Sequence, residues 1–114
     1  MMKKEVIPSE EHEFVPIRKS VTSGVSGMSL IPKDVTGVKV TLTHVSPGGK
    51  FHMHEDEYHH VFYVVNGNGE IYLENETHIV GPGTIVRIPS KTLHGYQNTS
   101  NQLLEIIMIN IPAA

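Results

Sequence analysis

The 114-residue sequence predicts an all-β protein, an antiparallel sandwich or barrel, on three observations. Ten glycines and seven prolines divide the chain into short segments. Those segments are rich in Val, Ile, Thr and Tyr, the residue types that favour strands. Turn signals recur at roughly 8–12-residue spacing, as in sandwiches and barrels, and no window carries a long apolar stripe at helical spacing.

The first predicted strands lie in the N-terminal half of the chain. Residues 38–45 (VKVTLTHV) alternate, and His44 shares a face with the apolar even-numbered residues. The sequence SPGG at 46–49 then predicts a chain reversal. The run HVFYVV at 60–65 is apolar nearly throughout, which predicts a strand covered on both faces. The sequence NGNG at 66–69 predicts a tight turn, because Asn and Gly tolerate positive φ.

The second half of the chain predicts further strands. Residues 70–74 alternate cleanly, with Ile71 and Leu73 facing inward, and 75–83 indicate a hairpin followed by a proline turn. The remaining predicted strands are 84–89, 94–98 and 103–111.

The domain organisation follows from this pattern. We expect residues 1–25 to form an N-terminal arm or edge strand, because the first twenty are acidic and poorly periodic, and residues 26–114 to form the barrel domain. A barrel this small leaves strand edges exposed, so a homodimer is expected, with the arm covering a neighbour's edge.

Composition excludes several classes of partner and ligand. The formal net charge is −3 and the nine basic residues are scattered, which argues against binding to nucleic acid or to an anionic membrane. With no cysteine, any metal ion must be held by imidazole nitrogen and oxygen. The N-terminus has no apolar core typical of a signal peptide, and no run of about 18 apolar residues occurs, so we expect a cytoplasmic protein without transmembrane segments.

Four of the eight histidines fall within nine residues. Residues two apart in a strand point the same way, so His52 and His54 are expected on one face as paired ligands of one ion. His60 continues that phase, whereas His59 would face the opposite side. If the barrel brings His94 alongside, three or four imidazoles converge, an arrangement that suits most first-row transition metals.

For several side chains the sequence allows two roles. His59 is the alternative third ligand, and Glu57 is a carboxylate ligand if its loop folds back, although the acidic run 55–57 is most simply solvated. His44 is either a partly exposed strand residue or a proton donor at the cavity wall. Tyr96 is a core residue or a hydroxyl available to a substrate.

Two segments together resemble the signature motifs of the cupins. The first motif reads Gly48 or Gly49, His52, His54, His60, six residues and Gly67. The second reads Gly83, five residues, Pro89, His94 and Asn98. Two positions depart from the pattern: His60 stands where the family usually has glutamate, and Lys91 stands where it usually has glycine.

The resemblance implies a jelly-roll barrel, or double-stranded β-helix. It also implies one divalent transition metal ion (Mn, Fe, Zn, Ni, Co or Cu) held by His52, His54, His60 and His94. Four neutral imidazoles would leave the ion its full charge and make it a strong Lewis acid. The implied function is a metal-dependent enzyme of dioxygenase or cyclase/isomerase type, polyketide cyclase-like, acting on a small carbonyl-bearing or phenolic molecule.

Two other functions stay open, and so does the question whether the protein is an enzyme. One is a non-catalytic sensor that binds a metal ion or small ligand in the same barrel. The other is a metal-free sugar epimerase that would use a His–Asp pair.

Overall fold

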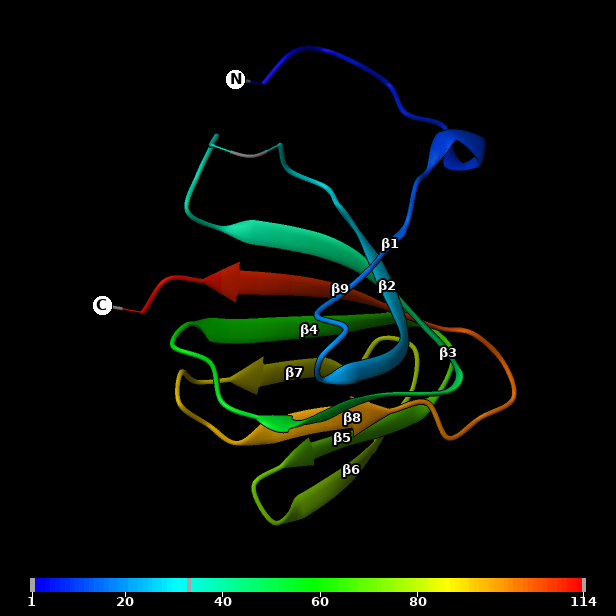
Figure 1. Cartoon of the computed structure of the whole chain (residues 1–114), viewed down its shortest axis with the longest axis vertical. Helices are drawn as coiled ribbons and strands as arrows, with labels where there is room; N and C mark the ends of the chain where they lie inside the picture. Colours follow the sequence, from blue (N-terminus) through cyan, green and yellow to red (C-terminus); the bar gives the residue numbers. More distant parts are fainter. Residues whose placement is uncertain (1, 33, 114) are drawn as a thin grey trace.

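The computed structural model describes residues 2–32 and 34–113 and confirms the all-β fold, because within these ranges a single three-residue 3₁₀ turn is the only helix. Figure 1 shows the strands wrapped around one interior. The elements are the turn η1 (Ser9–Glu11) and the strands β1 (Val15–Pro16), β2 (Thr22–Ser29), β3 (Lys39–His54), β4 (His59–Asn66), β5 (Gly69–Leu73), β6 (Glu76–Val80), β7 (Ile85–Ile88), β8 (His94–Gln97) and β9 (Leu104–Ile111). No helix in the described ranges is long and apolar enough to cross a membrane.

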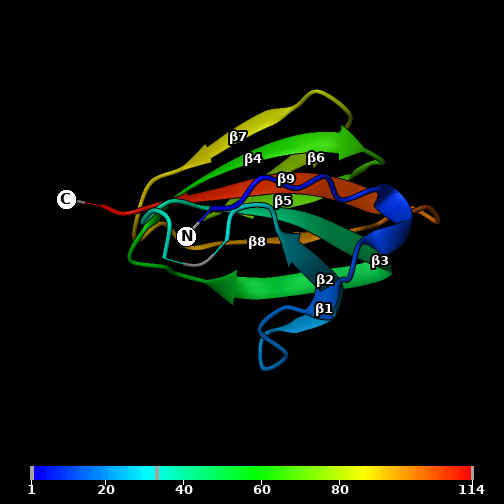
Figure 2. The same cartoon turned by 90° about the horizontal axis from the view of Figure 1, so that it is seen from above.

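All strand pairs are antiparallel, in the order β6-β5-β8-β3-β9-β4-β7, with β2 pairing β3 and β1 pairing β2. Figure 2 shows this sheet curled over on itself, with β4 and β7 on one side and β2 and β3 on the other. The tight turn predicted at 66–69 therefore does not close a hairpin. It carries the chain from β4, which pairs β7 and β9, to β5, which pairs β6 and β8.

The longest strand, β3, bends where we expected the chain to reverse. Residues 46–49 stay within the strand: before them Val45 pairs Leu104 of β9, and after them Phe51 pairs Tyr96 of β8. Gly48 has a φ of +79°, a conformation that glycine adopts readily, and this allows a change of direction without a reversal. Strand β2 follows β3 on both sides of the bend and fixes it.

The core lies between the inward faces of these strands. In β4 the residues His60, Phe62 and Val64 are buried, while Tyr63 between them is 44% exposed. The expectation that this strand is covered on both faces is wrong, because it forms the wall of a single curled sheet and no second layer among residues 2–32 and 34–113 covers Tyr63 on its outer face. Other buried apolar residues come from every part of the sheet: Val25, Val45, Phe51, Ile71, Val80, Val86, Ile88, Tyr96, Leu104 and Ile106.

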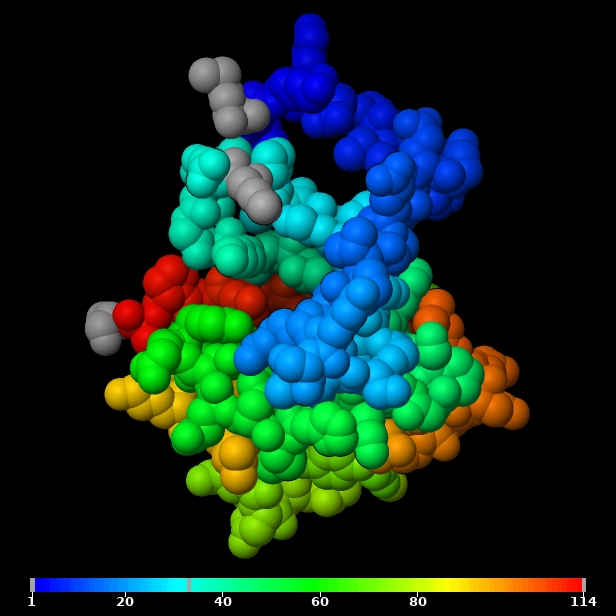
Figure 3. All heavy atoms as spheres, in the orientation of Figure 1, coloured from blue at the N-terminus to red at the C-terminus, as the bar shows by residue number. Residues whose placement is uncertain are grey.

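The N-terminal segment packs over this sheet. Figure 3 shows the start of the chain, in blue, leading from the top of the molecule down across its face. Phe14 stacks on His44, with ring centroids 4.0 Å apart, and the Nε2 of His44 lies 2.7 Å from a carboxylate oxygen of Glu105. Because the neighbours of His44 in β3, Thr43 and Val45, are buried inside, His44 faces outward and is not a donor at the cavity wall.

Candidate metal centre

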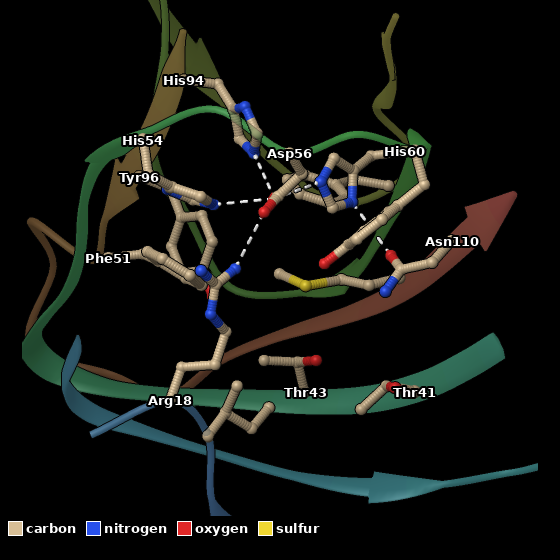
Figure 4. A pocket seen from close by; sticks show the side chains of 14 residues that line it. Arg18, Thr41, Thr43, Phe51, His54, Asp56, His60, His94, Tyr96 and Asn110 are labelled. Carbon is tan, nitrogen blue, oxygen red and sulfur yellow. Dashed lines mark hydrogen bonds and ion pairs between the residues drawn. The ribbon is translucent and has the colours of Figure 1, made fainter. Parts of the chain in front are cut away.

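A small polar cavity lies at one end of the barrel. Strand β3 contributes His54, β4 contributes His60 and β8 contributes His94, and the last is directly opposite His54 in the antiparallel ladder. The cavity has a volume of about 80 Å³, and these three rings line it. Figure 4 shows the rings pointing toward a common point occupied by Asp56.

The expected common face of His52 and His54 is not found. Phe51 pairs Tyr96 and His54 pairs His94, so three steps along β3 match two steps along β8. This extra residue is a β-bulge, and it breaks the two-residue alternation. As a result Phe51 and His54 both line the cavity, whereas His52 is exposed and does not.

Each of the three rings is oriented by a hydrogen bond from its Nδ1. The acceptors are the carbonyl oxygen of His52 for His54 (2.9 Å), the Oδ1 of Asn110 for His60 (2.9 Å) and the carbonyl oxygen of Thr92 for His94 (2.8 Å). Carbonyl oxygens only accept, so Nδ1 carries the proton and the Nε2 of a neutral ring presents a lone pair to the cavity. Such outer hydrogen bonds fix histidine ligands in metal centres.

A carboxylate oxygen stands at the point where the rings converge. The Oδ2 of Asp56 lies 2.9 Å from the Nε2 of His54, 2.9 Å from that of His60 and 3.7 Å from that of His94. A carboxylate oxygen and unprotonated Nε2 atoms all accept, so this arrangement needs a proton or a cation between them. The Asp56 side chain is only 7% exposed, and the Oδ1 accepts a hydrogen bond from Arg18 at 3.0 Å.

The electrostatics keep the donor atoms in the form that binds cations. Burial would raise the pKa of Asp56, but the hydrogen bond with His60 and the positive charges nearby hold it below its ordinary value of 3.8. Burial lowers the pKa of His94 to about 4, against the opposing effect of its hydrogen bond with Thr92. The carboxylate is therefore charged and the His94 ring neutral at pH 7, as metal ligation requires.

The donor set fits a divalent transition metal ion. Ligand atoms of His54, Asp56 and His94 all lie within 4.8 Å of one another, and the Nε2 of His60 is hydrogen-bonded to the same carboxylate oxygen. Three imidazole nitrogens and one carboxylate oxygen suit Mn, Fe, Co, Ni, Cu or Zn.

Asp56 is a residue of the site that the sequence analysis did not identify, because the acidic run 55–57 was expected to be a solvated loop. The spacing of the first motif could have identified Asp56. If His54 is the first ligand of the motif and Asp56 the second, the sequence reads His54, one residue, Asp56, three residues, His60, six residues and Gly67. The gap before His60 is then three residues, rather than the five that separate His54 from His60.

The other candidate residues lie outside the converging set. The Nδ1 of His59 accepts a hydrogen bond from the Ser90 backbone at 2.9 Å, on the opposite face of β4. The Glu57 side chain is 85% exposed, with its carboxylate 3.9 Å from the Nζ of Lys91. Lys91 itself has a φ of +64°, the conformation expected of the glycine that the family usually has there, and its backbone N–H donates to the Asp56 carbonyl at 2.7 Å.

Three further residues of the cavity were not predicted as parts of a site. Arg18 comes from the segment expected to be an arm, and Asn110 lies opposite His60 in the pairing of β4 with β9. Thr43 lies on β3, on the face opposite His44. No local motif marks them, because only the folded sheet brings them to the histidines.

Comparison with known proteins finds related sequences and folds. A family model described as the cupin domain matches residues 41–110. An uncharacterized protein of Methanocaldococcus jannaschii, MJ1618, is 33% identical over 86 residues, which cover 73% of this chain and 69% of that protein.

Two solved structures share the fold over nearly the whole chain. The polyketide cyclase RemF from Streptomyces resistomycificus is 25% identical with a TM-score of 0.84, covering 99% of this chain and 81% of RemF. A predicted oxalate decarboxylase from Thermotoga maritima is 20% identical with a TM-score of 0.85, covering 96% of this chain and 100% of that one. The expected resemblance is confirmed, and the chain belongs to the cupin family.

Proposed function

We propose that this cupin binds one divalent transition metal ion through His54, Asp56, His60 and His94, and that it is a metal-dependent enzyme acting on a small carbonyl-bearing or phenolic molecule. The observation that carries the proposal is the convergence of three Nε2 atoms on one carboxylate oxygen, each ring oriented by its own Nδ1 hydrogen bond. When bound, such an ion polarises a substrate oxygen as a Lewis acid.

The carboxylate changes the charge that we expected from an all-histidine centre. With Asp56 among the donors, the four side chains bring one negative charge to a dication, rather than none. Arg18 holds the outer oxygen of Asp56 at 3.0 Å and limits how far the carboxylate can turn. Phe51, Phe62 and Met108 line the same cavity and keep it poor in water, which strengthens electrostatic interactions within it.

Cyclisation or isomerisation is favoured over the other reactions by one comparison. RemF, a polyketide cyclase, shares the fold over 99% of the length of this chain. The reaction itself is tested by supplying diketones, phenols and oxalate to the protein loaded with Fe(II), Mn(II) or Zn(II). A cyclase or isomerase gives product without consuming dioxygen, whereas a dioxygenase consumes it and a sensor gives ligand-dependent melting shifts without turnover.

Metal binding is tested by histidine substitutions with an internal control. We expect near-stoichiometric metal in the purified protein and at least a hundredfold loss of affinity in His54→Ala and His94→Ala. His52→Ala removes a histidine two residues away whose side chain is exposed, so it should bind metal as the unsubstituted protein does. Equal loss in all three variants would contradict the proposed ligand set.

The His–Asp contacts also favour a second candidate, the metal-free epimerase. Asp56 lies 2.9 Å from two imidazoles, the distance of a proton-transferring pair. If elemental analysis finds no bound ion and chelators leave sugar epimerisation unchanged, this candidate replaces the first.

A further inference from the structure

The cavity holds polar groups that the metal ligands do not account for, and three of them carry this inference. The guanidinium of Arg18 and the hydroxyls of Thr43 and Tyr96 line the same space as the three histidine rings. Figure 4 shows Arg18 rising from below toward Asp56, with Tyr96 beside it and Thr43 beneath the open part of the cavity.

Both hydroxyls are buried without a partner. Thr43 is 0% and Tyr96 2% exposed, and neither the Thr43 Oγ1 nor the Tyr96 hydroxyl has a hydrogen-bonding partner among the described residues. A buried hydroxyl without a partner costs folding free energy, so two of them on one cavity wall indicate a group that they receive.

The backbone of Arg18 is fixed by a turn, and its guanidinium keeps N–H groups that are not hydrogen-bonded to the described residues. The turn that carries it is closed by a hydrogen bond from the Val21 N–H to the Arg18 carbonyl at 2.9 Å, and its guanidinium lies over the Phe51 ring, 5.3 Å from the centroid. Among the described residues the guanidinium donates only to Asp56, through Nη1, which leaves other N–H groups for a ligand.

Charge points to an anion. With a dication bound, the groups lining the cavity would carry +2 from the ion, +1 from Arg18 and −1 from Asp56. This leaves two net positive charges at a partly enclosed site, where the Arg18 side chain is 44% exposed and the Asp56 side chain 7%, and such a local field attracts an anionic ligand.

Asp56 shows which anion has the right shape. One of its oxygens accepts from the guanidinium at 3.0 Å while the other lies 2.9 Å from the Nε2 atoms of His54 and His60, so Arg18 stands one carboxylate's width from the candidate metal position, and a ligand carboxylate beside Asp56 can reach its remaining N–H groups. The cavity volume of about 80 Å³ leaves room for about six water-sized groups of the ligand inside it.

Given the proposed metal site, we propose that the ligand is a short carboxylic acid, such as a 2-oxo acid, whose carboxylate is bound by Arg18, Thr43 and Tyr96 beside the ion. Arginine suits this role because its planar N–H groups match a carboxylate. Longer acids can extend outward, because Tyr58 and Asn110 line both this cavity and a wider outer pocket of about 360 Å³.

The test compares probes that differ in charge but hardly in shape. Binding of pyruvate, pyruvamide and inorganic phosphate is measured by calorimetry on the Zn(II)-loaded protein and on four variants. Arg18→Gln removes the cation, Arg18→Lys keeps the charge without the planar donors, and Thr43→Val and Tyr96→Phe remove one hydroxyl each. Arg87→Gln, which removes an exposed arginine of β7, is the matched control.

We expect pyruvate to bind at least thirtyfold more tightly than pyruvamide and phosphate. Arg18→Gln should lower the affinity for pyruvate at least tenfold, and Arg18→Lys should lower it by less. Thr43→Val and Tyr96→Phe should each lower this affinity threefold to tenfold. Neither hydroxyl variant should have a lower melting temperature, because neither removes a hydrogen bond within the protein. Arg87→Gln should bind pyruvate unchanged. Equal affinity for pyruvate and pyruvamide, tighter binding of phosphate, or no effect of Arg18→Gln overturns the inference.

Zinc content of every sample separates this inference from the proposed function. Stoichiometric zinc with no preference for the carboxylate refutes the carboxylate site alone. Failure of the unsubstituted protein to retain zinc refutes the metal site on which the inference rests.

Discussion

The two ends of the barrel interior are built by the same strands and differ in chemistry. Along β4 the inward residues run from His60 through Phe62 to Val64, and along β3 the interior changes from His54 to Val45. One end is thus a cluster of imidazoles and a carboxylate, and the other is mainly apolar, with Val45, Val64 and Leu104 at 0% exposure and a buried Asn98 whose amide donates to the Val45 carbonyl. Strands β3 and β4 therefore each pack an apolar core at one end and carry a candidate ligand at the other.

The apolar end should dominate stability. Phe62 is 2% exposed and packs at the boundary of the two ends, and its truncation leaves a cavity. We expect Phe62→Ala to lower the free energy of unfolding by about 3–5 kcal/mol, and His60→Ala, two residues away, to lower that of the metal-free protein by no more than about 2 kcal/mol. Urea denaturation of both variants checks this difference, and a larger loss in His60→Ala would contradict it.

The polar end should instead control the response to pH. Burial lowers the pKa of His94 from its ordinary value of 6.5 to about 4, so between these values the unfolded chain binds a proton that the folded chain does not. The free energy of unfolding of the metal-free protein should therefore fall as pH drops through this window, by on the order of 2–3 kcal/mol. Urea denaturation at pH 7 and pH 4.5 measures the change.

His94→Asn serves as the control for this pH dependence, because it removes the titrating ring. Its loss of stability over the same window should be smaller than that of the unsubstituted protein. If both proteins lose the same free energy, another group is responsible.

The apolar end could be predicted largely from the sequence. Alternation and turn residues predict strands that match β4 to β9 and the first part of β3, because each strand's pattern is local: Ile71 in β5 and Val64 in β4 are buried as the sequence indicates. Two of the errors concern departures from regular strands, the bend at Gly48 and the bulge between Phe51 and His54. Both are fixed by pairing with β2 and β8, which no local pattern contains.

The polar end could be predicted only in part. Phase and spacing predict His54, His60 and His94, whose rings line one cavity in the structure, whereas the acidic neighbours of Asp56 predict a solvated loop. Its burial depends on a long-range hydrogen bond from the Lys91 N–H to its carbonyl and on Arg18 from the other end of the chain. Contacts of this kind come from tertiary structure, so the sequence shows the residue but not its position.

At the polar end, loss of the hydrogen bond that orients His60 should have a smaller effect, on the affinity for metal. Its Nδ1–H donates to the Asn110 Oδ1 at 2.9 Å, which directs the Nε2 lone pair to the metal position. We expect Asn110→Leu, which removes the acceptor, to weaken metal binding roughly 10–100-fold. Asn110→Asp keeps an acceptor and should bind more tightly than the leucine variant in a competition titration with a chelator. Equal affinities would show that the side chain of Asn110 only fills space.

The smallest effect concerns the loop that positions Asp56. Lys91 has a φ of +64°, which a residue with a Cβ adopts at a cost and glycine adopts freely. Lys91→Gly should therefore raise the free energy of unfolding by about 0.5–1 kcal/mol while preserving the backbone hydrogen bond to the Asp56 carbonyl. Lys91→Ala loses the same charge but keeps the Cβ, so it should bring no such gain. Denaturation curves of the two variants then separate backbone strain from the exposed pair with Glu57, and a gain in both would assign the effect to charge.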